Sequence, residues 1–193
     1  MRLLLWNRQI PATILLLCLT GCRPVPVPSN ANSNGTVTPA RTTPFMLSIV
    51  PTKSSSDSRF ITIAPEKPDE FYVVLTNISS EPQAVWETWN SWGARTISFE
   101  FTFGNNPPIV VARGPEDFTK NGPSTFLIPP GEHKIYPIRL DKWWDVRSIP
   151  KSAEAQVSLK AIYEVPVTPE AATYHVWTGR VESGNYSVTL RQW

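Results

Sequence analysis

The feature that most constrains the fold is a two-residue alternation of apolar and polar side chains. Residues 96–103, TISFEFTF, and residues 155–165, AQVSLKAIYEV, both follow it. Successive side chains of a β-strand point to opposite faces, so this period predicts strands with one buried and one solvated face. The side chains predicted to be buried are Ile97, Phe99, Phe101, Phe103, Val157, Leu159, Ala161, Tyr163 and Val165.

Further segments have the composition of strands: 45–50, 59–63, 71–77, 108–112, 133–140, 174–181 and 186–191. Between residues 93 and 131 glycines recur every 8 to 11 residues, and proline pairs add further breaks. Turns at this spacing between alternating strands predict an all-β sandwich or barrel, and no segment has a convincing helical period. Pro137 lies inside one predicted strand, which indicates an edge strand or a bulge.

Three phrases, LTNISSEP, IPPGEHKIYPIRL and VWTGRVESGNYSVTL, resemble the strand-turn phrases of immunoglobulin-like domains in bacterial envelope proteins. The resemblance implies an immunoglobulin-like antiparallel β-sandwich, which we assign to residues 44–193. The cysteine pair of antibody domains is absent, so the resemblance is to an architecture. A domain of about 150 residues buries nearly 70% of its unfolded surface, which suffices for an independent core.

The amino terminus, MRLLLWNRQIPATILLLCLTGC, has a basic start, a short apolar core and a cysteine at position 22. The apolar run is too short to span a bilayer. LTGC resembles the lipobox of bacterial lipoproteins, which implies that residues 1–21 are a signal peptide and that Cys22 carries diacylglycerol. Two or three acyl chains would hold the protein stably on membrane lipid. Arg23 follows the cysteine, which in a two-membrane envelope favours the outer membrane.

Residues 22–43 contain the lipidated cysteine and a Pro-, Asn-, Ser- and Thr-rich segment without aromatic residues. Such a segment cannot bury enough apolar surface to offset the entropy of ordering, so we expect a flexible linker. Cys18 leaves with the signal peptide and Cys22 is occupied by lipid. The mature protein is therefore expected to have no free thiol and no disulfide.

The charge balance excludes one class of partner. Removal of residues 1–21 leaves 16 basic and 16 acidic residues, without a basic run. A nucleic-acid binder needs a basic face, so we predict no nucleic-acid partner.

Catalytic and metal-binding patterns are not found in the sequence. The two histidines, His133 and His175, are far apart and lie outside any zinc motif. Residues 148–151, SIPK, match the letters of a serine-lysine motif, but Pro150 is incompatible with the helical turn that the motif needs. The few acidic pairs do not have the spacing of a calcium loop. We predict a protein that is not an enzyme and has no cofactor or metal.

The candidate binding residues are Trp89, Trp143 and Trp144. In residues 86–93, WETWNSWG, a strand would place Trp86 and Trp92 on a core face and Trp89 on the opposite face. Exposed tryptophans favour a protein partner in the envelope, since such rings dominate interface energetics. Two alternatives stay open. One is a carbohydrate- or cell-wall-binding module that uses these three rings, and the other is a proteinase inhibitor that acts through the loop PEDFTKNGPSTF.

Overall fold

The computed structural model describes residues 43–52, 54–55, 58–63, 68–151 and 154–192. They belong to one compact unit, Ala40–Trp193. The predicted signal peptide, Cys22 and the predicted linker up to residue 42 lie outside the described residues. In chain order the elements are β1 (Phe45–Pro51), β2 (Ser54–Ser55), β3 (Ser58–Ile63), β4 (Glu70–Asn77), β5 (Gln83–Trp86), β6 (Ile97–Thr102), β7 (Ile109–Ala112), β8 (Thr125–Ile128), β9 (His133–Arg139), η1 (Val146–Ser148), β10 (Glu154–Val165), α1 (Pro169–Thr173), β11 (Gly179–Glu182) and β12 (Tyr186–Gln192).

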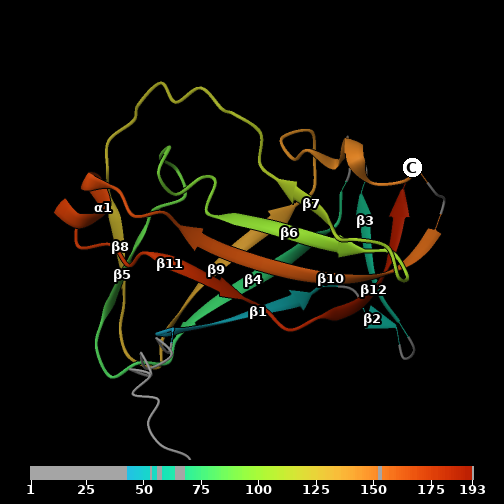
Figure 1. Cartoon of the computed structure of the whole chain (residues 1–193), viewed down its shortest axis with the longest axis horizontal. Helices are drawn as coiled ribbons and strands as arrows, with labels where there is room; N and C mark the ends of the chain where they lie inside the picture. Colours follow the sequence, from blue (N-terminus) through green and yellow to red (C-terminus); the bar gives the residue numbers. More distant parts are fainter. Residues whose placement is uncertain (1–42, 53, 56–57, 64–67, 152–153, 193) are drawn as a thin grey trace, which may run out of the picture. The chain divides into compact units, whose positions relative to one another are not determined.

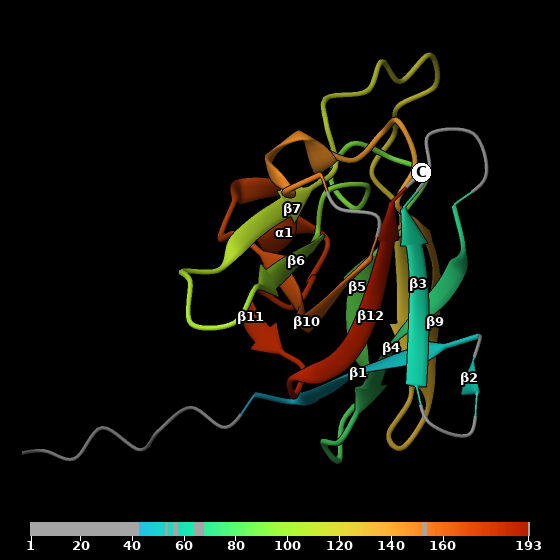
Figure 2. The ribbon, with the colours of Figure 1, turned by 90° about the vertical axis from the view of Figure 1, so that its right-hand side faces the viewer.

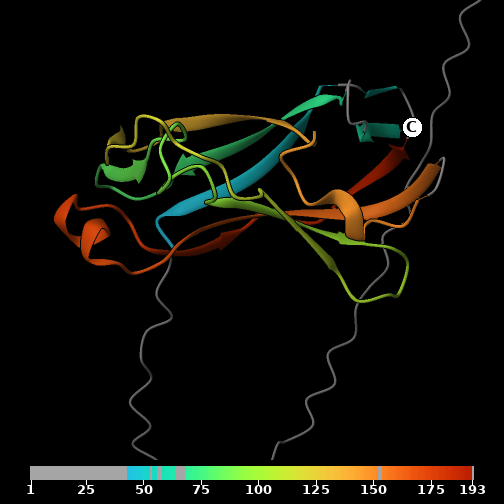
Figure 3. The same ribbon diagram turned by 90° about the horizontal axis from the view of Figure 1, so that it is seen from above.

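Two packed sheets form this unit. The first, which we call the three-stranded sheet, has the order β1-β4-β9 and is antiparallel throughout. The second, the large sheet, has the order β2-β3-β12-β10-β6-β7, and β11 also pairs with β10. β5 and β8 form a separate antiparallel pair. Figure 1 shows the strands of the two sheets crossing, and Figure 3 shows the two layers edge-on. The prediction of an all-β sandwich is confirmed.

One pairing departs from the predicted antiparallel arrangement. β3 runs parallel to β12, with Thr189 opposite Phe60 and Gln192 opposite Ile63. Figure 2 shows the two arrows side by side and pointing the same way. Parallel strands need a long connection, which the whole intervening chain supplies here. The alternation of apolar residues marks the buried face of a strand, but it does not encode the direction of the neighbouring strand.

The core lies between the inner faces of the two sheets. Every side chain predicted to be buried in residues 97–101 and 157–165 is buried, and Phe103 is partly buried against the same core. Phe71 of β4 meets Phe99 of β6 edge-to-face, with ring centres 5.4 Å apart. Aromatic pairs of this geometry stabilise beyond the area that they bury, so this contact joins the two layers.

β9 is an edge strand, as Pro137 predicted. The amide of Asn77 donates to the carbonyl of Glu132 at 3.0 Å, which fixes the phase of the alternating hydrogen bonds between β4 and β9. Every second residue of β9 therefore forms backbone hydrogen bonds with β4, and these residues include Lys134 and Tyr136. Pro137 lies between such residues, so its backbone groups point away from β4. Proline has no N–H, so it fits this outward position and blunts the edge against pairing with another strand.

The predicted strand 174–181 is wrong over its first half. Residues 169–173 form α1, in which the hydroxyl of Thr168 accepts from the amide of Ala171 at 3.1 Å and Pro169 begins the helix. His175 then adopts a left-handed conformation with φ 52°, which ends the helix. Only β11 remains of the predicted strand. A threonine followed by proline and glutamate is a helix-start signal, and a helix of five residues is too short to show a period.

Candidate functional site

The three tryptophans predicted to bind a partner have different environments. Trp89 is 56% exposed, and Trp143 is exposed as well. Trp144 is only 8% exposed, and its ring packs against Phe99 with ring centres 5.3 Å apart. The prediction that Trp144 is an exposed ring is therefore wrong, although the residue lines a cleft beside β9. A backbone bridge between Arg113 and Trp144 holds that residue against the core, while its exposed neighbour Trp143 is outside it.

Residues 87–96 form a turn after β5 and do not continue the strand. Trp86 is buried at the end of β5, and the chain returns so that the ring of Trp92 lies 5.9 Å from that of Trp86. Trp89 points outward. The predicted division of the three rings is confirmed for Trp86 and Trp89, while Trp92 is partly buried. The reason for this division differs from the predicted one. A turn brings Trp86 and Trp92 together, and not the two-residue repeat of a strand.

Asn90 and Gly93 fix the shape of this turn. The fully buried Asn90 side chain donates to the carbonyl of Ser124 at 3.2 Å and accepts from the amide of Gly93 at 3.0 Å. A Cβ atom at position 93 would lie 2.0 Å from the carbonyl oxygen of Glu87. Only glycine allows this approach of two backbone segments, so the turn is a rigid part of the fold.

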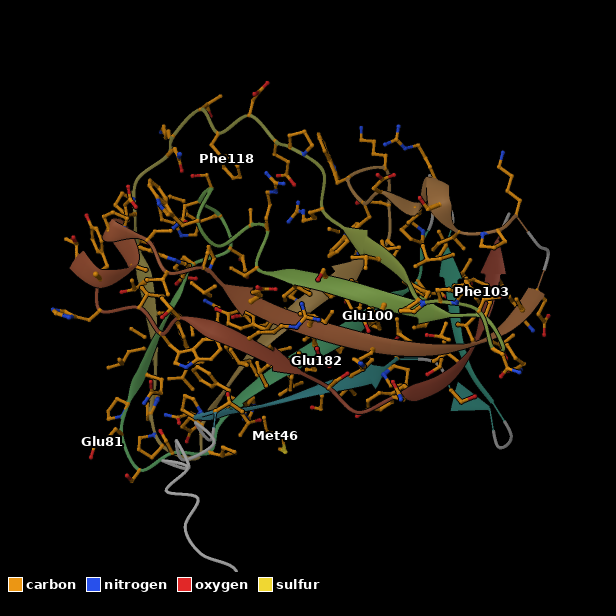
Figure 4. All side chains as sticks on the ribbon, viewed as in Figure 1. Met46, Glu81, Glu100, Phe103, Phe118 and Glu182 are labelled. Carbon is orange, nitrogen blue, oxygen red and sulfur yellow. The ribbon has the colours of Figure 1, made fainter. Side chains whose placement is uncertain are left out.

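The loop between β7 and β8, where Phe118 is labelled in Figure 4, is attached to the turn. The amide of Ser91 donates to Asn121 Oδ1 at 3.0 Å, and Asn121 Nδ2 donates to Ser91 Oγ at 2.9 Å. The amide of Glu87 donates to the carbonyl of Ser124 at 3.0 Å. The proteinase-inhibitor alternative assigned binding to this loop. In the structure, Asn121 and Ser124 of the loop form hydrogen bonds with the turn of the same domain.

The turn contributes to two clefts. The first, of about 420 Å³, follows β9, and Ile97, Ile138 and Trp144 are among its lining residues. The Tyr136 hydroxyl is enclosed, and its burial, together with the neighbouring Tyr163, raises the pKa of Tyr136 well above its ordinary value. The basic side chains of this cleft are in ion pairs of 2.6 to 2.9 Å: Arg113–Glu116, Lys134–Glu87 and Arg139–Glu70. The first cleft therefore offers few uncommitted charges.

The second cleft, of about 380 Å³, lies on another side of the turn. Its lining residues are Trp86, Ser91, Trp92, Arg95, Thr96, Glu164, Pro166 and Thr168. Arg95 is exposed and makes no ion pair or hydrogen bond with any described residue. This cleft thus combines aromatic rings with an available cation. The sequence prediction missed it because its walls come from a turn and from the segment after β10.

The outer side of the three-stranded sheet carries apolar side chains in its central rows. In the strand register, one outward row is Val50, Tyr72 and Pro137, the next is Ser48, Val74 and Ile135, and the row beyond is Met46, Thr76 and His133. Ile135 is 51% exposed, and Met46 and Val50 are exposed to a similar degree. We call this surface the apolar face; its residues are Met46, Val50, Tyr72, Val74, Ile135 and Pro137. At its rim Arg139 pairs with Glu70 at 2.9 Å, so these two charges are neutralised locally.

The outer side of the large sheet is covered by ion pairs. Lys160 contacts Glu100 at 3.2 Å and Glu182 at 3.1 Å, and Arg180 contacts Glu182 at 2.8 Å and Glu164 at 3.1 Å. Figure 4 shows Glu100 and Glu182 on the strands that flank β10. Hydrogen bonds from Arg180 and Lys160 hold the pKa of the Glu182 carboxyl below its ordinary value. We call these residues, Glu100, Lys160, Glu164, Arg180 and Glu182, the ion-paired face.

Within the described residues, no three His, Cys, Asp or Glu side chains gather as metal ligands would. In the same part of the chain, no helix has both the length and the apolar character that crossing a bilayer requires.

No protein-family model matches this chain, and no curated protein matches it significantly.

Proposed function

We propose that the protein is a non-catalytic, lipid-anchored envelope protein whose sandwich binds a protein partner through the apolar face. The observation that carries this proposal is the contrast between the two outer faces. The large sheet meets water with paired charges, whereas the three-stranded sheet exposes Met46, Val50 and Ile135. Contiguous exposed apolar side chains rimmed by polar groups are typical of interaction surfaces.

The sequences of β1 and β4 support a covered face. β1 reads FMLSIVP and β4 reads EFYVVLTN, so apolar residues occupy both faces of each strand. Near-continuous apolar runs are typical of strands that are buried on both sides. The inner side chains of these strands lie in the core, and of the outer ones Met46 and Val50 stay exposed within the described residues. A partner on the apolar face would complete the burial that the sequences indicate.

The chemistry of the apolar face favours a protein over a nucleic acid or an anionic lipid surface. Its rim charges, Glu70 and Arg139, neutralise each other, so no cation is left over to attract phosphate. The outward backbone position at Pro137 disfavours a strand added to the edge of β9. The fitting partner is therefore a protein with an uncharged apolar patch that packs onto the face of the sheet.

The first cleft adjoins the apolar face, because Ile135 and Pro137 also line it. A volume of about 420 Å³ is large enough for a bulky side chain of a partner. Interface energy is concentrated where an aromatic or aliphatic side chain fills a desolvated pocket. We expect the partner to insert such a side chain beside β9 while its surroundings cover the apolar face.

The anchor rests on the sequence LTGC and has its own test. Cys22→Ser removes the sulfur to which diacylglycerol would be attached, so the variant should accumulate as an unprocessed precursor. Metabolic labelling with a radioactive fatty acid should mark the wild-type chain only. Equal labelling of both chains would contradict the anchor without bearing on the apolar face.

The docking proposal is tested by site-specific photo-cross-linking of the full chain in intact envelopes. A photoreactive phenylalanine analogue at Ile135 probes the apolar face, and the same analogue at Glu182 probes the ion-paired face. We expect one discrete protein adduct from position 135 and none from position 182. Val50→Lys, placed on the apolar face, should abolish the adduct, whereas Val110→Lys, on the other sheet, should leave it unchanged.

Four results would overturn the docking proposal. Equal adducts from both positions would indicate non-specific contact, and an adduct insensitive to Val50→Lys would place the partner elsewhere. An adduct of twice the mass of the chain would identify a second copy of the protein as the occupant. Cross-linking to lipid alone from position 135 would mean that the apolar face lies on the membrane.

A further inference from the structure

The second cleft has a fixed aromatic wall. Trp92 is partly buried, and its ring lies 5.9 Å from that of Trp86 at an interplanar angle of 35°. Trp86 is buried and also meets Tyr174, with ring centres 5.7 Å apart. Because Trp86 is held in the core, it supports Trp92 from behind and fixes its orientation. An aromatic ring held in this way offers an apolar plane against which a flat ligand can pack.

The same cleft contains one cation that is available to a ligand. Arg95 is exposed and forms neither an ion pair nor a hydrogen bond with any described residue, unlike Arg139 in the first cleft. The carboxylate of Glu164, also in the lining, is bound by Arg180 at 3.1 Å. The planar guanidinium of arginine matches a carboxylate in a two-point contact. A single guanidinium also matches the single charge of a carboxylate better than the double charge of a phosphate.

The remaining polar groups are mainly donors. The hydroxyl oxygen of Thr168 accepts from the amide of Ala171, and that of Ser91 accepts from Asn121 Nδ2. Each hydroxyl therefore keeps its proton for another acceptor. Neither Trp86 nor Trp92 donates its indole N–H to a described residue, and neither nitrogen is among the enclosed polar atoms without a partner. A cleft with surplus donors fits a ligand with many acceptor oxygens.

We infer that the second cleft binds an acidic sugar, with its ring against Trp92 and its carboxylate on Arg95. A volume of about 380 Å³ lies within the range of small-molecule sites. Sugar hydroxyls supply the acceptors for the hydroxyls of Ser91 and Thr168 and a donor for Glu164. This inference is independent of the proposed function, since the cleft does not include the apolar face. It relocates the carbohydrate-binding alternative from Trp89, Trp143 and Trp144 to Trp92 and Arg95.

The test is a titration of the full chain in detergent with four probes: N-acetylmuramic acid, glucuronic acid, glucose and acetate. Ligand-observed saturation-transfer NMR measures the dissociation constant and shows which protons of the sugar face an aromatic ring. We expect saturable binding of at least one of the two acidic sugars. Glucose and acetate should each bind at least tenfold more weakly, because each has only one of the two required groups.

Two pairs of variants assign the binding to the cleft. Arg95→Gln should weaken binding of the acidic sugar at least tenfold, and Arg139→Gln should leave it unchanged. Trp92→Phe keeps an aromatic ring packed against the core but offers the ligand a smaller flat surface, so it should weaken binding several-fold. Trp89→Phe changes an exposed tryptophan outside the cleft and should have no effect. A thermal melt of each variant confirms that the fold is retained.

The absence of saturable binding of both acidic sugars to the wild-type chain would overturn the inference. So would equal affinity for acetate, which would indicate a carboxylate site without sugar recognition, or unchanged binding by Arg95→Gln. The cross-linking at position 135 should be insensitive to Arg95→Gln. Failure of this inference and failure of the docking proposal can therefore be told apart.

Discussion

The two sheets have similar inner faces and opposite outer faces. Inside, Leu75 of β4 and Leu159 of β10 are both fully buried. Outside, Ile135 on the three-stranded sheet is 51% exposed among other apolar side chains, whereas Lys160 on the large sheet lies between two carboxylates. The core needs only one apolar face from each sheet. The core does not require the second apolar face, and the proposed partner would account for it.

The largest expected effect tests whether the two inner faces are equivalent. Leu75→Ala and Leu159→Ala each remove a fully buried side chain, so each should lower the free energy of unfolding by about 2–5 kcal/mol. Denaturant unfolding of the purified chain measures both. A loss at Leu75 far below that at Leu159 would break the comparison, since the three-stranded sheet would then be loosely packed even on its inner side.

The next effect separates stability from binding on the apolar face. Val50→Lys replaces an exposed apolar side chain, so it should change the free energy of unfolding by no more than about 0.5 kcal/mol. It should nevertheless weaken partner binding at least tenfold, because a buried unpaired charge is costly at an interface. Unfolding curves and the yield of the position-135 adduct are the two measurements. Val110→Lys is the matched control and should change neither.

A smaller effect is expected on the ion-paired face. Arg180→Met removes a cation that contacts Glu100, Glu164 and Glu182. Glu100 and Glu182 keep Lys160, whereas Glu164 loses its ion-pair partner. Exposed ion pairs contribute little individually, so we expect a loss of about 0.5–1 kcal/mol at low salt. The loss should shrink in 1 M salt because screening weakens surface charges. An unchanged loss in salt would indicate that Arg180 acts through packing of its side chain.

The smallest effect is the pH dependence of Glu182. Arg180 and Lys160 lower the pKa of this carboxyl below its ordinary value of 4.5, so the ionised form stabilises the fold. That contribution is present above pH 4.5 and is lost as the pH falls through the lowered pKa. The stability difference between wild type and Glu182→Gln should therefore shrink as the pH falls below 4.5 and disappear once it is below the lowered pKa. A difference that grows below pH 4.5 would reverse the sign of the interaction.

The long strands could be predicted because the sandwich buries one face of each strand in one continuous core. β6 alternates strictly in sequence and β10 does so except at Ile162, and each predicted bound lies within one residue of the observed one. β5 and β8 were missed because their sequences, QAVW and TFLI, neither alternate nor form a β-branched run like the IVVA of β7, which is equally short. The parallel pairing of β3 and β12 was missed because strand direction depends on the tertiary fold.

The candidate sites were less predictable than the strands. Trp143 and Trp144 are neighbours in sequence, yet one is exposed and the other is buried, which depends on a bridge to Arg113. The second cleft is built where the turn and the segment after β10 meet, and no local pattern indicates such a meeting. The apolar face did have a signal. The near-continuous apolar runs of β1 and β4 could have indicated strands covered on both sides.

The most direct measurement of the central claim is the rate of thiol labelling at one position on each outer face. Ile135→Cys and Val110→Cys have similar exposure, 51% and 58% for the native residues, and the chain without an added cysteine is the control for background. In the purified protein both cysteines should react with maleimide at similar rates. In intact envelopes the account predicts that Val110→Cys keeps its rate while Ile135→Cys reacts at least tenfold more slowly. Equal rates at both positions in envelopes would contradict the claim that a partner covers the apolar face.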